Sequence, residues 1–302
     1  MFVVDLHCDS LSRVNADRGL ISSYNMSREH PQLQLVAEFV PARDDAPEVR
    51  RRKLMHYLDV YISEIQRLEL LEVRTCHDVN YAVEMERRAT LLSVEGGGGL
   101  FADSEELNTL YRMGMRVLGP IWDSNELGTC AWDREDRGLT REGERLVERC
   151  SEMGVILDVS HMSDRSLERT LQISPYPVLA THSNYREVCG SPRNLPLDLA
   201  RRIATRGGVI GLNIYPSFLT DNAVATAEDI FAHLDYGIDK LGAEAIALGL
   251  DIDGTDGAYP EGLEDDSSIH DKLIDLLWRR YDESTVERLV GLNAINFFKQ
   301  NL

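Results

Sequence analysis

The chain of 302 residues is 43% hydrophobic and 27% charged, which is ordinary for a soluble globular protein, and no apolar run approaches the ~18 residues of a membrane span. Its 32 basic and 51 acidic side chains give a net charge of −19, which disfavours nucleic acid and anionic membranes as partners because both would repel the chain. Five scattered cysteines and the short apolar stretch in the N-terminal MFVVDLHCDS argue against a disulfide scaffold, a cysteine-based zinc site and a secretory signal, so we expect a cytoplasmic protein.

Eight short segments rich in β-forming residues are predicted to be strands, and nearly all are followed by a stretch with helical periodicity. The strands are expected at residues 2–7, 33–40, 90–94, 116–121, 155–160, 177–181, 208–213 and 245–249. The helices are expected at residues 47–71, 104–113, 141–153, 164–173, 197–205, 227–241, 266–281 and 283–300. This alternation is typical of a parallel sheet, and eight strands indicate an α/β fold of the TIM-type (β/α)₈ barrel class.

Residues that cap helices mark several of these boundaries. Thr140 and Ser163 precede expected helices, and an acidic residue follows each of them in the first turn, where it interacts favourably with the helix dipole. No Ser/Gly-rich linker, low-complexity tract or repeat interrupts the series. We therefore expect residues 1–302 to form a single barrel domain.

The ends of five predicted strands carry side chains of the types that bind metal ions. Catalytic groups of a TIM-type barrel gather at the C-terminal ends of its strands, so polar residues just after each apolar run are the first candidates. They are His7 with Asp9, Glu95, His161, His182, and Asp251 with Asp253. Taken singly, each residue has an ordinary structural explanation, such as a glutamate that caps a turn or a histidine at the barrel rim whose nitrogens are hydrogen-bonded within the protein. Together, in barrel order, they favour a metal site.

The local sequence supports this interpretation. His7 and Asp9 are two residues apart, so on an extended chain both side chains point to the same face and could reach one ion. Glu95 follows the apolar LLSV and precedes four glycines, whose lack of side chains would leave room for ions or substrate. None of the four lysines ends a predicted strand, so a lysine-derived bridging carboxylate is not expected and Glu95 is predicted to be the bridge.

Five motifs occur in the order found in renal-type (membrane) dipeptidases: DLHCDS, SVEGGGG, LDVSHMSD, THSNYREVCGSPRNLP and LGLDIDG. These enzymes belong to the amidohydrolase-type metal-dependent hydrolases. The chain resembles this family from His7 to the C-terminal GLNAINFF, apart from the divergent residues 11–30. The resemblance implies two zinc ions at the barrel mouth. One ion would be held by His7, Asp9 and Glu95, and the other by Glu95, His161 and His182.

A mechanism follows from the same resemblance. The two ions would share Glu95 and a water, and the lowered pKa of that water would supply a hydroxide to attack the peptide carbonyl. Asp251 matches the aspartate that passes the water's proton to the leaving amine, so Asp251 and Glu95 are the expected catalytic residues. Arg193 matches the arginine near the substrate, and Asp253 is expected to assist substrate binding. The alternatives are a purely electrostatic role for Asp251 and a surface salt bridge for Arg193.

Two positions depart from the family pattern. Trp122, in GPIWDSNELG, stands where mammalian members place a histidine that contacts the scissile carbonyl oxygen, and Gly98 stands where a histidine often follows EGG. The pattern resembles a microbial branch of the family. Activity is still expected, but the substrate preference of the mammalian enzymes does not carry over.

The leading hypothesis is a zinc-dependent dipeptidase that cleaves dipeptides, including those with a D-residue at the carboxyl side. Because relatives are commonly dimeric, a homodimer is considered as well. The first alternative is a related metal-dependent amidase or deacylase acting on N-acyl amino acids or lactams, since the same chemistry serves any amide. The second is a metal-binding or substrate-binding protein without turnover, for which Trp122 would be the starting argument.

Overall fold

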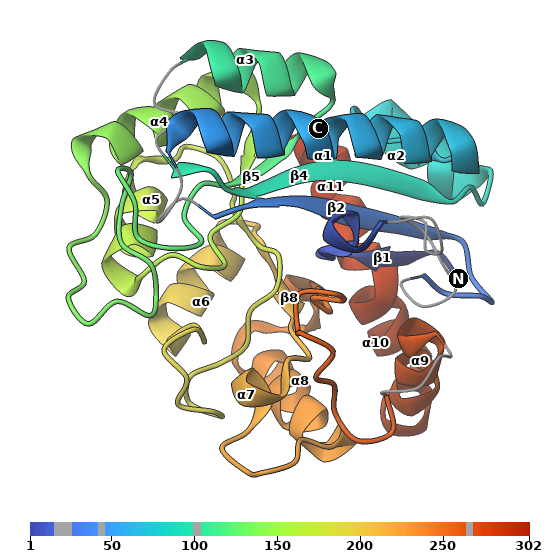
Figure 1. Cartoon of the computed structure of the whole chain (residues 1–302). Coiled ribbons are helices and arrows are strands. Elements are labelled where there is room, and N and C mark those ends of the chain that lie inside the picture. Colours follow the sequence, from blue (N-terminus) through green and yellow to red (C-terminus); the bar gives the residue numbers. More distant parts are fainter. Residues whose placement is uncertain (15–25, 42–45, 99–103, 264–267) are drawn as a thin grey trace.

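The computed structural model describes residues 1–14, 26–41, 46–98, 104–263 and 268–302. Among these residues, eight parallel strands lie side by side in the order β6-β5-β4-β2-β1-β9-β8-β7. Figure 1 shows β4, β2 and β1 of this sheet next to one another. The bounds of the eight strands are β1 Val3–Asp5, β2 Gln32–Val40, β4 Ala89–Gly96, β5 Val117–Gly119, β6 Ile156–Leu157, β7 Leu179–Ala180, β8 Val209–Leu212 and β9 Ile246–Leu248. Each of them falls within or beside one of the predicted strands.

The two ends of this row meet at β6 and β7, where the sheet closes. Asp158 pairs with Leu179 in an isolated parallel bridge, and the backbone N–H of Val159 donates a hydrogen bond of 2.8 Å to the Leu179 carbonyl. The eight described strands therefore form a nearly closed cylinder, which confirms the predicted TIM-type barrel.

Helices cover the outside of the barrel (Figure 1). Those of the described residues are α1 Pro47–Leu68, α2 Cys76–Glu84, α3 Ser104–Met113, α4 Arg141–Met153, α5 Asp164–Ile173, α6 Leu197–Thr205, α7 Pro216–Leu219, α8 Ala227–Leu241, α9 Ile269–Arg280, α10 Glu283–Glu287 and α11 Asn293–Asn301, with a π-helical turn η4 at Arg288–Leu292. The predicted bounds of α3, α4, α5, α6 and α8 are confirmed.

Other helices differ from the prediction. Helix α1 ends at Leu68 instead of residue 71, because Glu69 adopts a left-handed φ of 52°, and Leu71–Glu72 form a short strand β3 that pairs with β4. Helix α2 was not predicted, although Thr75 and Asp78 form a capping box at its start. The first two residues of the helix expected at 266–281 lie outside the described residues, and α9 spans Ile269–Arg280. The expected helix at 283–300 is divided into α10, η4 and α11.

The barrel interior is filled by an apolar cluster with at least one residue from each of the eight strands. Leu33 and Leu35 of β2 lie opposite Ala89 and Leu91 of β4 in register and belong to this cluster. Phe297 and Phe298 of α11 pack into the same cluster, so α11 covers the N-terminal end of the barrel. The polar ends of the strands are left at the opposite, C-terminal mouth.

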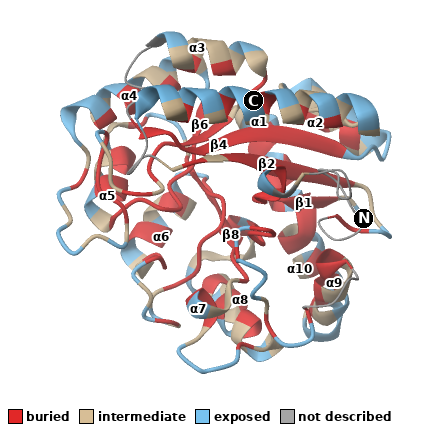
Figure 2. Ribbon diagram, viewed as in Figure 1, coloured by how far each residue is buried: buried red, intermediate tan, exposed pale blue. Residues whose placement is uncertain are grey.

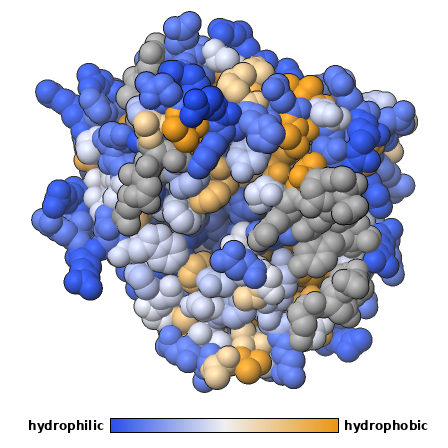
Figure 3. All heavy atoms as spheres, in the orientation of Figure 1, coloured by the Kyte–Doolittle hydropathy of each residue, from blue (hydrophilic) through white to orange (hydrophobic). Residues whose placement is uncertain are grey.

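A second apolar cluster lies between the strands and the surrounding helices, so the strands are buried on both faces (Figure 2). The outer faces of the helices are exposed, and most of the surface visible in Figure 3 is hydrophilic. None of the described helices is long and apolar enough to cross a bilayer.

Candidate metal centre

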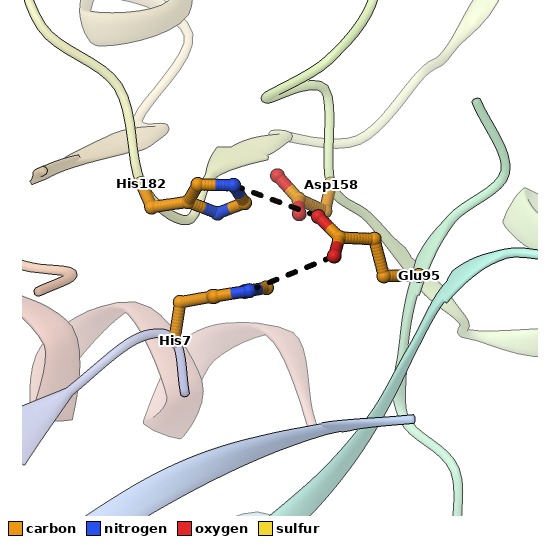
Figure 4. Close-up of side chains that lie close together, drawn as sticks. All are labelled: His7, Glu95, Asp158 and His182. Carbon is orange, nitrogen blue, oxygen red and sulfur yellow. Dashed lines mark ion pairs between the residues drawn. The ribbon is translucent and has the colours of Figure 1, made fainter. Parts of the chain in front are cut away.

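The carboxylate of Glu95 faces the imidazoles of His7 and His182, two of the predicted metal ligands (Figure 4). Its Oε1 lies 2.8 Å from His161 Nε2 and 3.5 Å from His182 Nε2. Its Oε2 lies 3.7 Å from His7 Nε2. One carboxylate oxygen therefore faces His161 and His182, which follow β6 and β7, and the other faces His7, which follows β1. This is the arrangement of a carboxylate that can bridge two ions.

Two aspartates surround His7 on the side of β1 and β9. His7 Nε2 lies 3.5 Å from Asp9 Oδ2 and 3.8 Å from Asp251 Oδ1, and donor atoms of the three residues lie within 4.8 Å of one another. A Cβ at Gly254 would lie 2.2 Å from Asp251 Oδ1 and 2.3 Å from Asp9 Oδ2. Only glycine therefore fits between the two carboxylates.

The glycine that follows Glu95 is required for a reason other than the predicted one. Gly96 has a φ of 86°, and a Cβ there would lie 2.3 Å from the carbonyl oxygen of Val40 in the neighbouring strand β2. Its role is thus to let β4 leave the sheet close to β2. Gly99, the last residue of the glycine run, lies outside the described residues.

The sequence analysis gave no role to Asp158, which the structure brings into the same cluster (Figure 4). Donor atoms of Asp158, His7, Glu95 and His182 lie within 4.8 Å of one another. Asp158 lies three residues before His161, in the otherwise apolar segment ILDV. An acidic residue at the end of a buried strand is the signal that would have identified it.

A buried carboxylate below the centre joins the ends of β1 and β9. Asp5 Oδ1 accepts hydrogen bonds from the backbone N–H groups of His7 at 3.2 Å and of Leu250 at 3.0 Å. Asp5 Oδ2 lies 2.8 Å from His270 Nε2, and both side chains are fully buried. Asp5 thus fixes the chain at His7 and just before Asp251, a contact that sequence spacing could not reveal.

The centre has an excess of negative charge. Burial alone would lower the pKa of His7, but the carboxylates of Glu95 and Asp9 raise this pKa to about 10. Burial raises the pKa of Asp251 to about 7, against the opposing effect of His7. Burial also raises the pKa of Glu95 well above its usual range. Several buried carboxylates therefore surround one imidazolium. A bound cation would reduce the repulsion between these carboxylates.

The two histidines on the other side of Glu95 differ from His7. Burial lowers the pKa of His161 well below its usual value, and the nearby Arg193 adds to this effect. Burial likewise lowers the pKa of His182, followed by the effect of His7. Both imidazoles are therefore held neutral, the form that coordinates metal ions.

Several polar atoms of the centre are buried without a hydrogen-bond partner within the described part of the chain. They include His7 Nε2, Asp9 Oδ1 and His161 Nδ1. Burying such atoms unpaired is costly, so they point to a group that the protein itself does not supply. Neutral imidazole nitrogens together with carboxylate oxygens form a donor set that suits zinc.

Arg193 lies directly behind His182. The guanidinium donates hydrogen bonds from Nη1 to Ser183 Oγ at 3.1 Å and from Nη2 to the His182 carbonyl at 2.9 Å, and the side chain is buried. Burial lowers the pKa of Arg193 to about 10, against the effect of Asp251 and other carboxylates. Arg193 is therefore part of the centre rather than of a surface salt bridge.

Asp253 lies at the β1 edge of the mouth. It has a φ of 72°, its Oδ2 accepts a 2.7 Å hydrogen bond from Ser10 Oγ, and its backbone N–H donates to Tyr259 Oη at 3.2 Å. These contacts hold the loop after β9 against the turn after β1. The side chain is buried among protein groups, close to but distinct from the Glu95 cluster.

Trp122, the departure from the family histidine, faces the centre. Its ring centroid lies 6.0 Å from that of His161 and 4.8 Å from that of Phe39. Trp132 lies 6.1 Å from His161 on another side and is 44% exposed. The wall beside His161 is thus aromatic.

Curated proteins similar in sequence to this chain include dipeptidases. Dipeptidase 3 of Homo sapiens is 30% identical over 222 residues, which are 71% of this chain and 45% of that protein, so the chain spans less than half of that relative. An uncharacterised protein from the pqqA 5′ region of Klebsiella pneumoniae is 30% identical over 236 residues, which are 74% of this chain and 85% of that protein.

Solved structures share the fold. The crystal structure of dipeptidase AC, a metallopeptidase, superposes with a TM-score of 0.89 at 24% identity, covering 100% of this chain and 98% of the other. A metallopeptidase from Rhodobacter sphaeroides, liganded with a phosphinate mimic of the dipeptide L-Ala-D-Ala, superposes with a TM-score of 0.86 at 23% identity, covering 100% and 99%. The sequence model of the membrane dipeptidase family, peptidase family M19, matches residues 1–301, and the chain therefore belongs to that family.

Proposed function

We propose that this chain is a zinc-dependent dipeptidase that hydrolyses the peptide bond of dipeptides. The observation that carries the proposal is the placement of Glu95, whose two carboxylate oxygens face His161 and His182 on one side and His7 on the other. Family membership favours the same activity.

In this proposal Glu95 would be shared by two zinc ions. His7 and Asp9 would complete one set of ligands, and His161 with His182 would complete the other. The unpartnered buried atoms His7 Nε2 and Asp9 Oδ1 support this assignment, because a cation would satisfy them. When bound, the ions would polarise the peptide carbonyl and lower the pKa of water toward neutrality.

Asp251 is the proposed proton carrier. Its Oδ2 accepts a 2.9 Å hydrogen bond from Asn213 Nδ2, which fixes the carboxylate. Its Oδ1 faces the side of His7, so Oδ1 is the atom that would take a proton from water and deliver it to the leaving amine. A carboxylate held in one orientation transfers protons without first reorganising.

Arg193 and Asp253 are proposed to act on the substrate. The Arg193 guanidinium donates one hydrogen bond from each terminal nitrogen, to Ser183 and to the His182 carbonyl, and its Nε has no partner among the described residues. Its contribution would be its charge and its remaining N–H groups. A fixed cation beside the ligands would stabilise a carboxylate or a developing oxyanion. Asp253 would shape the opposite edge of the mouth.

For the substrate, we propose small dipeptides, with a D-residue accepted at the carboxyl side. The Rhodobacter sphaeroides relative binds a mimic of L-Ala-D-Ala, which supports testing that stereochemistry first. The aromatic wall formed by Trp122 and Trp132 would favour apolar over charged side chains in the residue beside His161.

The test combines metal analysis with two substrate panels. Zinc content of the purified protein is measured by elemental analysis, and amine release is followed on L,L- and L,D-dipeptides and on N-acetyl amino acids. We expect about two zinc ions per chain and turnover confined to the dipeptides. Turnover only of the N-acetyl amino acids would establish the deacylase alternative, and full zinc loading without turnover on either panel would contradict an enzymatic function.

A further inference from the structure

Asp158 stands in the candidate centre, yet its carboxylate is fully occupied by the protein. Its Oδ1 accepts hydrogen bonds from the backbone N–H groups of Ser160 and Thr181, both at 3.0 Å, and from Ser160 Oγ at 2.6 Å. Its Oδ2 accepts a hydrogen bond from Thr181 Oγ1 at 2.6 Å. A carboxylate with four donors has little capacity left for an ion, which distinguishes Asp158 from Asp9 and Glu95.

The hydroxyl of Thr181 connects this carboxylate to a predicted ligand. Thr181 Oγ1 also lies 2.8 Å from Nδ1 of His182 and, at the limit of a hydrogen bond, 3.5 Å from Nδ1 of His7. A hydroxyl has one hydrogen, and the 2.6 Å hydrogen bond that Thr181 Oγ1 donates to Asp158 Oδ2 uses it. In the contact with His182, Thr181 must then be the acceptor and Nδ1–H the donor.

This direction of donation fixes the tautomer of His182. With its hydrogen on Nδ1, the neutral imidazole has its lone pair on Nε2. Nε2 is the atom that lies 3.5 Å from Glu95 Oε1 and 2.9 Å from His161 Nε2. The backbone is fixed as well, because the N–H of His182 donates to Ser160 Oγ at 3.1 Å. His161 lacks such a partner, since its Nδ1 has none among the described residues.

We propose that Asp158 and Thr181 are positioning residues, which hold the Nε2 lone pair of His182 ready for a metal ion through a fixed chain of hydrogen bonds. This inference rests on the proposed function for the identity of the ion. The hydrogen bonds of this chain are all made between protein groups, so we expect the metal-free protein to hold His182 in the same tautomer.

The test reads the tautomer directly in protein labelled with ¹⁵N-histidine and freed of metal. A long-range ¹H–¹⁵N correlation spectrum distinguishes protonated from unprotonated ring nitrogens, and the His182→Asn variant assigns the His182 signals. In the unaltered protein we expect Nδ1 protonated and Nε2 unprotonated. An Nε2-protonated His182 in this protein would overturn the proposal.

Two variants and one control then perturb the chain. In Asp158→Asn the amide can donate to Thr181, so the Thr181 hydroxyl turns toward His182 and the tautomer reverses. In Thr181→Val the acceptor is lost and the tautomers mix. Zinc affinity, measured by competition with a chromogenic chelator, should fall by about 10- to 100-fold in both variants. Thr181→Ser retains the hydroxyl and should keep both the tautomer and the affinity.

The outcomes separate this inference from the proposed function. Unchanged tautomer and zinc affinity in folded Thr181→Val and Asp158→Asn, with dipeptide turnover intact, would overturn the inference and leave the function standing. The expected tautomer shifts in a protein that cleaves no dipeptide would support the inference and overturn the function. If Thr181→Val does not fold, as judged by circular dichroism, Asp158→Asn with the Thr181→Ser control decides the question.

Discussion

The two sides of the candidate centre are organised by opposite means. On the side of β6 and β7, the carboxylate of Asp158 accepts four hydrogen bonds from the protein. On the side of β1 and β9, Asp9 and Asp251 crowd around His7, and Asp9 Oδ1 has no hydrogen-bond partner in the described part of the chain. Hydrogen bonds between protein groups preorganise the β6 and β7 side. On the β1 and β9 side, carboxylates repel one another, and a bound cation would offset this repulsion.

The largest expected effect comes from Asp251→Asn. Because the amide cannot accept and pass on a proton, kcat for dipeptide hydrolysis should fall by about 10²- to 10⁴-fold, while zinc content stays unchanged. Steady-state kinetics with elemental analysis checks both parts. Loss of zinc in this variant would instead make Asp251 a ligand and remove the distinction between Asp251 and Asp9.

Gly254→Ala should damage the β1 and β9 side selectively. The new Cβ would lie within 2.3 Å of a carboxylate oxygen of both Asp9 and Asp251, so one of them must move. We expect about a 10- to 100-fold loss of zinc affinity, measured by chelator competition. Gly190→Ala is the matched control, because a Cβ there meets nothing within 4 Å. Equal zinc affinity in both variants would refute the crowding argument.

Zinc should stabilise the protein chiefly through the crowded side. At a free zinc concentration 100 times the Kd, binding contributes about 2.7 kcal/mol to the free energy of unfolding. In Asp9→Asn the metal-free protein should be more stable than the unaltered chain, because repulsion with Asp251 is relieved, and the gain from zinc should shrink.

Urea unfolding with and without zinc measures this pair of effects. In Asp158→Asn, by contrast, the metal-free protein should be less stable than the unaltered chain, because one acceptor becomes a donor. If both variants shift the metal-free stability in the same direction, the two sides are not organised differently.

The smallest expected effect concerns the pH dependence of stability and comes from His233, a histidine away from the metal centre. His233 is fully buried, accepts a hydrogen bond from the Tyr185 N–H at 3.3 Å, and places Nε2 3.0 Å from the Leu219 carbonyl. Burial lowers the pKa of His233 to about 4, so below the unfolded value of about 6.5 the unfolded chain binds the extra proton.

Stability should therefore fall as the pH drops from 6.5 toward 4, by at most about 1.4 kcal/mol per pH unit from this group. The difference in urea unfolding between the unaltered protein and His233→Gln, at pH 7.5 and pH 5, isolates the contribution. The contribution of His233 to the free energy of unfolding should be the same with and without zinc. A zinc-dependent difference would mean that His233 is coupled to the centre.

Much of this arrangement could be predicted because a parallel barrel brings the C-terminal ends of its strands together. That rule alone is enough to group His7, Glu95, His161 and His182, and helix caps such as Thr140 and Ser163 are enough to place the helices that follow them. The capping box of Thr75 and Asp78 is a further start signal that the sequence contains, at α2.

The remaining features depend on distances between strands, which sequence spacing does not report. The saturation of Asp158 requires β6 and β7 to be neighbours in a particular register, and the contact of Asp5 with Leu250 joins residues at opposite ends of the chain. The positive φ of Asp251 likewise depends on the packing of the loop that follows β9. These features follow from closure of the barrel rather than from local pattern.

The seam between β6 and β7 has a mechanical consequence. It is closed by a single described bridge, Asp158 to Leu179, and His161 and His182 stand just beyond its two strands. An ion held between these histidines would add a further link across this seam. The protein's own hydrogen bonds already close this seam, so ion binding would reinforce it, and amide protons along the seam should exchange more slowly with solvent when the ion is bound.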